Sequence, residues 1–243
     1  MTPSATRAHR IRRTLACFAG AAAIALCGAA RSENVVFSGA EGSSNSSYAY
    51  LGTVMPMDGE QLGRGWYRKA VISMIRYRFS STERGAAEEV NGKVPGIEGG
   101  IGHAWQFGTR RIDLSATIGY RNIGLAPFEP KDEKSGNIIT LNPQLMAYTP
   151  LVGRSDADLI ANYSIGLGSS FVRLRAGFRP AEGWRTGVEV KRLKGDTYET
   201  RAAGVFIAIP LSKTFSLDFT AGKEKPRDDP SVSYGGLAFS AVF

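Results

Sequence analysis

The chain has 243 residues, of which 43% are hydrophobic and 21% charged, and its formal net charge is +8. Both cysteines, Cys17 and Cys27, lie in the first 32 residues, so the rest of the chain can form neither a disulfide framework nor a thiolate metal site. Those 32 residues also hold five arginines and no carboxylate, so residues 33–243 carry a net charge of only +3, which removes the main argument for a nucleic-acid partner.

The N-terminal segment has the pattern of a secretory signal peptide. Four arginines precede an apolar, alanine-rich stretch at residues 15–30, and small residues around Ala30 fit a cleavage site. The apolar stretch is short for a membrane helix. We therefore expect residues 1–32 to be a cleaved signal peptide and residues 33–243 to form a single domain. An uncleaved N-terminal anchor is the alternative.

Alternation with a period of two predicts β-strands along the remaining chain. In residues 111–120, for example, Ile112 and Leu114 share one face while Asp113 and Ser115 share the other. About twelve such segments can be counted, with about ten to fourteen as the range. Their predicted positions are 35–41, 47–55, 66–79, 95–107, 111–121, 138–149, 157–167, 171–179, 184–192, 198–209, 215–223 and 232–243.

Such strands suit either a soluble sandwich or an antiparallel transmembrane β-barrel of the outer-membrane type, which is all-β. The barrel is favoured because several links alternate between long polar loops and short turns, and because the polar face is rich in glycine and serine. Aromatic residues near strand ends suit a lipid interface. The aromatic residues expected on the outer face are Tyr48, Tyr50, Trp66, Trp105, Phe107, Tyr120 and Trp184.

The last segment has the features expected of a closing strand. Leu237, Phe239, Ala241 and Phe243 alternate on one face. Because lipid tolerates no open sheet edge, we expect this strand to pair with the first one, near residues 35–37. The ending also resembles the signal read by the barrel-assembly machinery, so Phe239 and Phe243 are predicted to act as the assembly signal.

Few residues could carry chemistry. His103 is the only histidine in residues 33–243, and it shares a phase with Ile101 and Trp105, so it is expected near the lipid interface and not as the general base of a hydrolase. The sequence has neither the histidine spacing of a zinc site nor a phosphate-binding loop. We therefore expect no catalytic residue, no metal site and no cofactor.

A set of charged residues is expected to face the lumen. Two hypotheses follow. Either the charges brace and fill a narrow lumen as an ion-pair network, or they line a passage for anionic solutes. The predicted lumen residues are Arg68, Arg76, Arg78, Glu98, Asp113, Arg173, Arg175, Arg185, Glu189, Lys191 and Asp218.

Two stretches carry a family resemblance. The first is V-V-F-S-G-A-E-G-S-S, followed by Y-A-Y-L-G-T-V-M-P-M-D-G-E-Q-L-G-R-G-W-Y-R, and the second is G-V-E-V-K-R-L-K-G-D-T-Y-E-T-R-A-A-G-V-F. Their F-S-G, Gly-aromatic-x-Arg, Gly-Asp-x-Tyr and Arg-x-x-Gly spacings resemble the bacterial cellulose biosynthesis protein BcsS family. Residues 122–150 match no motif of that family.

The resemblance implies a non-enzymatic accessory barrel of the Gram-negative cell outer membrane that serves cellulose or exopolysaccharide biosynthesis or export, and so biofilm formation. It supplies no catalytic residues. The partners expected are outer-membrane lipid, the barrel-assembly machinery, and cellulose or components of the cellulose-synthase complex, with no nucleic acid. Two alternatives are a small anion-preferring porin and an outer-membrane lipid-modifying enzyme that uses His103.

Overall fold

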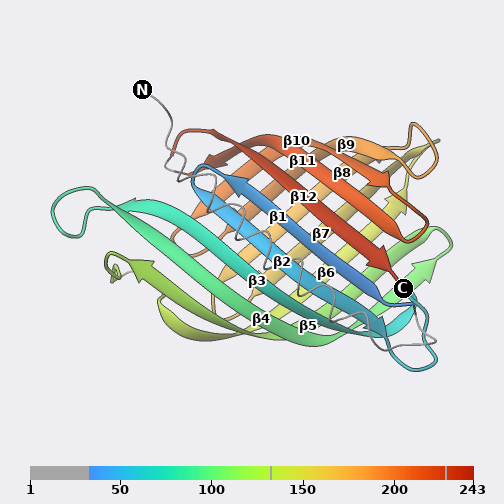
Figure 1. The fold of residues 1–243 in the computed structure, drawn as a ribbon, viewed down its shortest axis with the longest axis horizontal. Coiled ribbons are helices and arrows are strands. Elements are labelled where there is room, and N and C mark those ends of the chain that lie inside the picture. The colour runs from blue at the N-terminus through green and yellow to red at the C-terminus, as the bar shows by residue number, and fades with distance from the viewer. Residues whose placement is uncertain (1–32, 132, 228) are drawn as a thin grey trace. The chain divides into compact units, whose positions relative to one another are not determined.

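The structure of the chain is a computed structural model that describes residues 33–131, 133–227 and 229–243. The predicted signal peptide, residues 1–32, lies outside them. Over the described residues the chain forms twelve antiparallel strands that close into one barrel, in which each strand pairs with its neighbours in sequence (Figure 1). The all-β prediction and the count of twelve are confirmed. The strands are β1 (Val35–Ser43), β2 (Ser46–Pro56), β3 (Gly65–Ser81), β4 (Glu88–Phe107), β5 (Arg110–Ala126), β6 (Gly136–Pro150), β7 (Ser155–Ser164), β8 (Ser169–Phe178), β9 (Arg185–Lys194), β10 (Glu199–Pro210), β11 (Phe215–Pro226) and β12 (Val232–Val242).

None of the described residues belongs to a helix with the length and apolarity needed to span a membrane.

The barrel closes where the first and last strands meet. β1 and β12 pair from Val35 opposite Val242 to Ser43 opposite Tyr234. Beyond them the backbones of Asn34 and Phe243 exchange hydrogen bonds of 2.7 and 2.9 Å. The predicted pairing of the last strand with the first is confirmed. We call the end of the barrel that holds Asn34 and Phe243 the terminus end, and the opposite end the far end.

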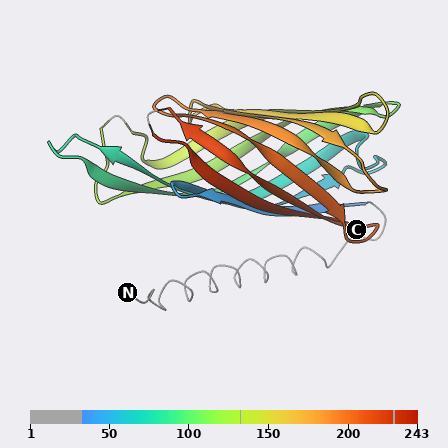
Figure 2. The same ribbon diagram turned by 90° about the horizontal axis from the view of Figure 1, so that it is seen from above.

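Three consecutive strands are longer than the others. β3 and β5 have 17 residues each and β4 has 20, whereas a strand that crosses lipid needs about 9–11. Their surplus extends the sheet at the far end, where the β3–β4 hairpin reaches past its neighbours in both views (Figures 1 and 2). The sequence predicts the fourth strand from residue 95, but it begins at Glu88. Residues 88–94 were missed because charged and glycine residues interrupt the apolar pattern there.

Around the middle of the barrel the two faces of the sheet differ sharply in polarity. Large apolar side chains on the outer face are exposed, for example Ile118 at 66% and Ile139 at 74%, whereas polar side chains on the inner face are buried, for example Asp113 at 3% and Thr140 at 1%. Polar burial requires hydrogen-bond partners, and an exposed apolar belt requires an apolar solvent. The barrel therefore holds its polar groups inside and presents an apolar belt outside.

This polarity reverses in the far-end extension of β3 and β4. Val90 and Val94 face inward there and are buried, at 0% and 4% exposure. Outward positions of the same segment carry Arg76, Arg78 and Lys93, all exposed. Side chains continue to alternate along each strand, but the outer face is no longer in the apolar belt. Beyond the belt, toward the far end, the outer face meets water and the apolar side chains of the inner face pack against one another.

Several inward aromatic rings lie against glycines of the neighbouring strand. A Cβ atom at Gly39 would stand 2.6 Å from the Tyr50 Oη atom, and one at Gly102 would stand 2.5 Å from that of Tyr67. Glycine is required where a ring approaches the backbone this closely. Tyr48 stacks on Tyr50 with ring centroids 5.3 Å apart and faces inward on the same phase. The expectation that Tyr48 and Tyr50 lie on the outer face is therefore wrong, because both faces of β2 are largely apolar and its alternation is ambiguous.

Candidate functional site: a charged network across the lumen

A network of charged side chains lies in the lumen, and two of its ion pairs join strands that are not neighbours. Arg175 of β8 donates from Nε to Glu189 of β9 at 2.8 Å. Its two terminal nitrogens donate to Asp218 of β11 at 2.7 and 3.1 Å, a bidentate pair across two intervening strands. The side chains of Arg175 and Glu189 are 6% and 0% exposed. Glu189 is thus fully removed from solvent and needs these partners.

Lys191 extends the network to the seam of the barrel. Its Nζ atom lies 2.6 Å from a carboxylate oxygen of Glu41 on β1 and 3.1 Å from one of Glu189. It also lies 3.9 Å above the ring of Tyr234, whose hydroxyl donates to Glu189 at 2.8 Å. β9 and β1 are four strand spacings apart, which is about 19 Å along the wall. The pair of Lys191 and Glu41 therefore bridges, through the interior, about a third of the twelve-stranded wall. We call these six residues the central network: Glu41, Arg175, Glu189, Lys191, Asp218 and Tyr234.

A second cluster lies toward the terminus end. Asp156 of β7, whose side chain is 2% exposed, accepts from Arg179 at 3.0 Å and from Arg185 at 2.6 Å. The guanidinium groups of Arg185 and Arg175 both lie over the ring of Phe206, at 4.8 and 4.5 Å from its centroid. This shared ring joins the cluster to the central network, so ion pairs lie at two successive levels along this part of the lumen.

Eight of the eleven predicted lumen residues face inward, and they fall into three groups. Arg175, Glu189, Lys191 and Asp218 are brought together in the central network, and Arg185 joins Asp156. Others are held locally: Asp113 accepts a bidentate pair from Arg111, and Glu98 accepts from Asn142 at 3.0 Å. Arg173 also faces inward, but no ion pair within 4 Å is formed by it in the described part of the chain, and its Nε atom is buried without a hydrogen-bond partner.

The structure corrects the expectation for Arg68, Arg76 and Arg78. They share the outward phase of β3 with Trp66 and Ile72, which are exposed, while Tyr67 and Val71 of the other phase are buried. Sequence reasoning assigned the charged phase to the lumen throughout, but at the far end of β3 the outward positions of Arg76 and Arg78 lie beyond the apolar belt and meet water. Arg68 lies on the outer wall between Trp66 and Ile72.

Sequence reasoning also missed several partners inside the lumen. Glu41, Asp156 and Asp158 face inward, as does Tyr234. The alternation in residues 155–164 does place both aspartates opposite the apolar residues, so that signal was present. Glu41 ends a weakly patterned segment, and Tyr234 looks like an interfacial aromatic, so neither was detectable.

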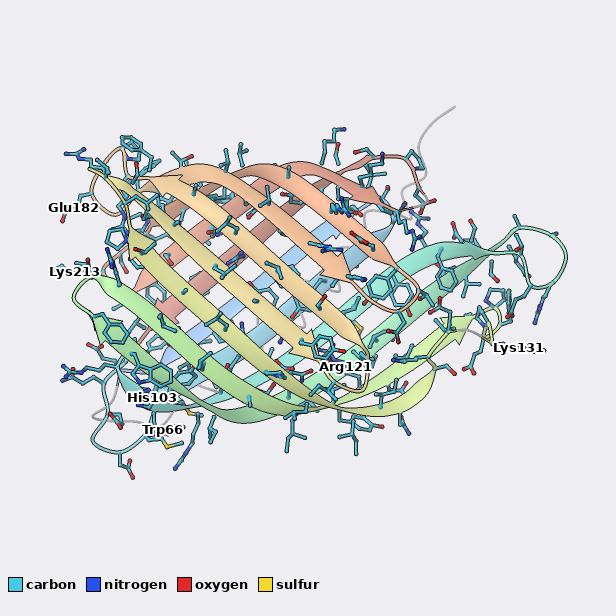
Figure 3. The ribbon with its side chains drawn as sticks, turned by 180° about the vertical axis from the view of Figure 1, so that it is seen from behind. Trp66, His103, Arg121, Lys131, Glu182 and Lys213 are labelled. Carbon is cyan, nitrogen blue, oxygen red and sulfur yellow. The ribbon has the colours of Figure 1, made fainter. Side chains whose placement is uncertain are left out.

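His103 lies on the outer wall near the terminus end. Its ring contacts the ring of Trp66, which is labelled beside it in Figure 3, with centroids 4.9 Å apart, and the ring of Trp105, with centroids 4.4 Å apart. In the described residues neither a hydroxyl nor a carboxylate hydrogen-bonds its ring, and its Nδ1 atom is buried without a partner. A general base needs an orienting partner and a nucleophile within reach. The arrangement is that of an aromatic interface cluster.

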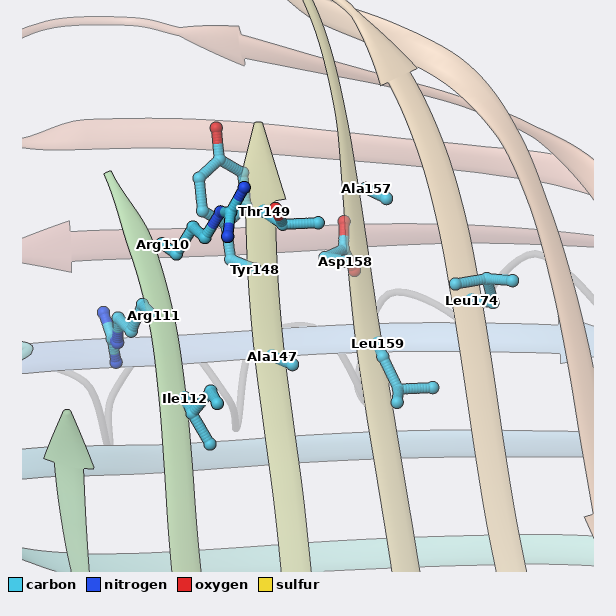
Figure 4. Close-up of a pocket in the computed structure, with 10 residues that line it drawn as sticks. All are labelled: Arg110, Arg111, Ile112, Ala147, Tyr148, Thr149, Ala157, Asp158, Leu159 and Leu174. Carbon is cyan, nitrogen blue, oxygen red and sulfur yellow. The ribbon is translucent and has the colours of Figure 1, made fainter. Parts of the chain in front are cut away.

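A shallow depression of about 250 Å³ lies on the outer wall over β5 to β8 (Figure 4). Ala147 and Ala157 leave space there between the larger Ile112, Leu159 and Leu174. These five apolar side chains lie on the outward phase, and Arg110, Thr149 and Asp158 also line the depression, which therefore lies at the terminus-end edge of the apolar belt.

The closed sheet, its apolar belt and its charged lumen define a β-barrel of the outer-membrane class. A family model described as cellulose biosynthesis protein BcsS matches residues 35–243. The chain belongs to this family, which is a family of cellulose biosynthesis, and the resemblance seen in the sequence is confirmed. Among curated proteins, none matches the chain by sequence.

Solved structures of bacterial barrels share the fold. An outer membrane channel from Pseudomonas putida F1 is 13% identical with a TM-score of 0.56, and the match covers 88% of this chain and 97% of the channel. The Pseudomonas putida toluene transporter TodX is 10% identical with a TM-score of 0.52, covering 88% and 90%. The transport unit of the Escherichia coli autotransporter AIDA-I is 7% identical with a TM-score of 0.51, covering 90% and 92%. At these identities the likeness concerns the fold alone.

Proposed function

We propose that this chain is a non-enzymatic accessory barrel of the cell outer membrane that supports cellulose production with an occluded lumen. The observation that carries the proposal is the central network, whose pairs of Arg175 with Asp218 and of Lys191 with Glu41 bridge three and four spacings of the twelve-stranded wall inside the lumen. A polymer that passed along this part of the lumen would have to separate these side chains. Separating Arg175 from Asp218 and Lys191 from Glu41 would leave the two cations, whose side chains are 6% and 8% exposed, without these partners, and an unpaired buried cation is costly. The family membership connects the barrel to cellulose.

The orientation follows from the unequal ends. Outer-membrane barrels have short periplasmic turns and larger extracellular parts. The extended β3–β4 hairpin lies at the far end, so we place the far end outside the cell and the terminus end in the periplasm. Export through a cleaved signal peptide of residues 1–32 fits this placement. A tagged protein should fractionate with the outer membrane and migrate differently before and after heating. A soluble periplasmic protein would refute the placement.

The test of the accessory role compares cellulose made with cellulose secreted. In a strain that lacks the gene, we expect the secreted fraction or its organisation to fall while the synthase in isolated membranes keeps its rate. Complementation with the wild-type chain should restore secretion. If the deletion leaves secreted cellulose unchanged in amount and architecture, the proposed role is wrong.

A second candidate, a small anion-preferring porin, is favoured by Arg173. Its buried Nε atom without a partner offers a cation to a passing anion. A porin would show stepwise conductance in planar bilayers, with an anion preference that Arg173→Gln reduces. The occluded barrel should be silent, and a variant that carries both Arg175→Ala and Lys191→Ala should open it. A conducting wild-type protein would favour the porin.

A further inference from the structure

A patch of exposed cations lies on the outer wall at the far end, over β9, β10 and β11. We call it the cationic patch. Its side chains point away from the lumen and take no part in the central network. All five members are exposed. They are Arg192, Lys194, Arg201, Lys223 and Lys225.

The patch places like charges directly opposite one another. Arg201 is the register partner of Arg192 on one side and of Lys225 on the other, so three cations form a row across three strands. Glu199 accepts from Arg192 at 3.1 Å and from Arg201 at 2.8 Å. Glu199 is the one carboxylate on the outward phase of β9, β10 and β11 and contacts two of the five cations, while Lys223 donates to the hydroxyl of Ser233 at 2.9 Å. Opposed like charges destabilise a sheet. An external anion would relieve the repulsion.

The apolar belt begins immediately below the patch. On β9 the outward residue before Arg192 is Val190, which is 51% exposed, and on β10 Val205, at 58%, lies two outward positions from Arg201. The patch therefore follows the boundary between apolar and polar surroundings. A ligand that met both surfaces would carry anionic groups at one end and acyl chains at the other.

We infer that the cationic patch binds the phosphate groups of a phosphorylated glycolipid in the outer leaflet, whose acyl chains lie along the valines of β9 and β10. This inference depends on the proposed outer-membrane location and orientation. Guanidinium groups pair with phosphate in bidentate geometry, and clusters of lysine and arginine beside an apolar surface attract anionic lipid. The patch is convex and solvated, as shown by Arg192 and Arg201, whose side chains are 52% and 73% exposed. A free phosphate would keep its water there, whereas a lipid is also held by its chains.

The test measures lipid retention by the purified full-length barrel in detergent, with native mass spectrometry. The probes are bisphosphorylated lipid A, the same lipid with its phosphates removed, and phosphatidylglycerol. We expect wild-type protein to retain lipid A and to lose most of this retention when the phosphates are removed or when salt is raised. This arm uses wild-type protein alone, so it holds even if a variant fails to fold.

Two matched triple variants each remove three positive charges, one at the far end of the barrel and the other at the terminus end. Arg192→Gln, Arg201→Gln and Lys225→Gln together should weaken lipid A binding about 100-fold, since each cation near a lipid surface contributes about one tenfold step or slightly less. The control, Arg68→Gln with Arg110→Gln and Lys213→Gln at the terminus end, should change binding less than about threefold.

Four outcomes would overturn the inference. The first two are retention of dephosphorylated lipid A as strong as that of bisphosphorylated lipid A, and a loss of binding in the control triple variant as large as in the patch variant. The other two are binding of phosphatidylglycerol as tight as that of lipid A, and displacement of lipid A by inorganic phosphate at a concentration similar to that of the lipid. The assay contains no cellulose and no synthase. Normal lipid binding with unaltered cellulose secretion in the deletion strain would refute the proposed role alone. Absent lipid A binding together with a secretion defect in the deletion strain would refute the lipid inference and support the proposed role.

Discussion

Arg175→Ala is the substitution that tests the central network most directly. It leaves Asp218 without its bidentate partner and removes one of three donors from Glu189, which stays buried with Lys191 and Tyr234. Removing one partner of a buried ion pair costs about 3–5 kcal/mol. Because Glu189 keeps two donors, we expect a loss of about 3 kcal/mol in the free energy of unfolding. Arg175→Lys should have a free energy of unfolding between those of the wild type and Arg175→Ala, since lysine keeps the positive charge but cannot form the bidentate pair of a guanidinium group.

The measurement is urea unfolding of the barrel refolded into lipid vesicles, followed by tryptophan fluorescence. Arg201→Ala is the matched control because this arginine also pairs with a glutamate, but its side chain is 73% exposed. Exposed pairs contribute little, so its unfolding midpoint should hardly move. If Arg175→Ala shifts the free energy of unfolding no more than Arg201→Ala, the lumen charges are hydrated and the occluded lumen is refuted.

Three further substitutions test the wall of the barrel. Gly39→Ala should destabilise the barrel by about 1–3 kcal/mol, because the added Cβ atom would overlap the ring of Tyr50. Gly99→Ala is the control and should be tolerated, since the nearest atom to its Cβ would be a backbone oxygen 3.8 Å away. The same urea titration distinguishes the two variants. Ile118→Arg should cost about 2–4 kcal/mol if the belt lies in lipid, and Asn122→Arg, nearer the far end on the same face, about 0–1 kcal/mol; equal costs would argue against a membrane there. Phe243→Ala should lower the amount of heat-modifiable protein in the outer membrane if this residue belongs to an assembly signal, and unchanged amounts at equal expression would refute that role.

The strands were predictable because the signal is local. A lipid-crossing strand shows its two faces at alternate positions, so a short window such as residues 111–120 contains the whole pattern. All twelve segments were located in this way, and errors gathered at their ends. The outward phase of Trp66, Trp105, Phe107 and Tyr120 followed from the same rule, as did that of Leu237 and Phe239.

The failures share one cause. Alternation shows that two faces differ, but it does not show which face is inside. For Arg76 and Arg78 the polar face is the outer one, because β3 has left the apolar belt at that height. For Tyr48 and Tyr50 the aromatic face is the inner one, since glycines of the neighbouring strand accommodate their rings, as at Gly39. Both depend on neighbours that a single segment does not contain.

By itself, the sequence determined the class of the fold, the approximate number of strands and the meeting of the first strand with the last. These properties rest on side-chain periodicity and on the requirement that a sheet in lipid has no free edge. Only the tertiary structure decided which charges meet in the lumen. Glu41 reaches Lys191, 150 residues away, because closure of the barrel curves the wall so that the inner faces of β1 and β9, four strand spacings apart, turn toward each other. Curvature and register set that distance, and no local pattern records them.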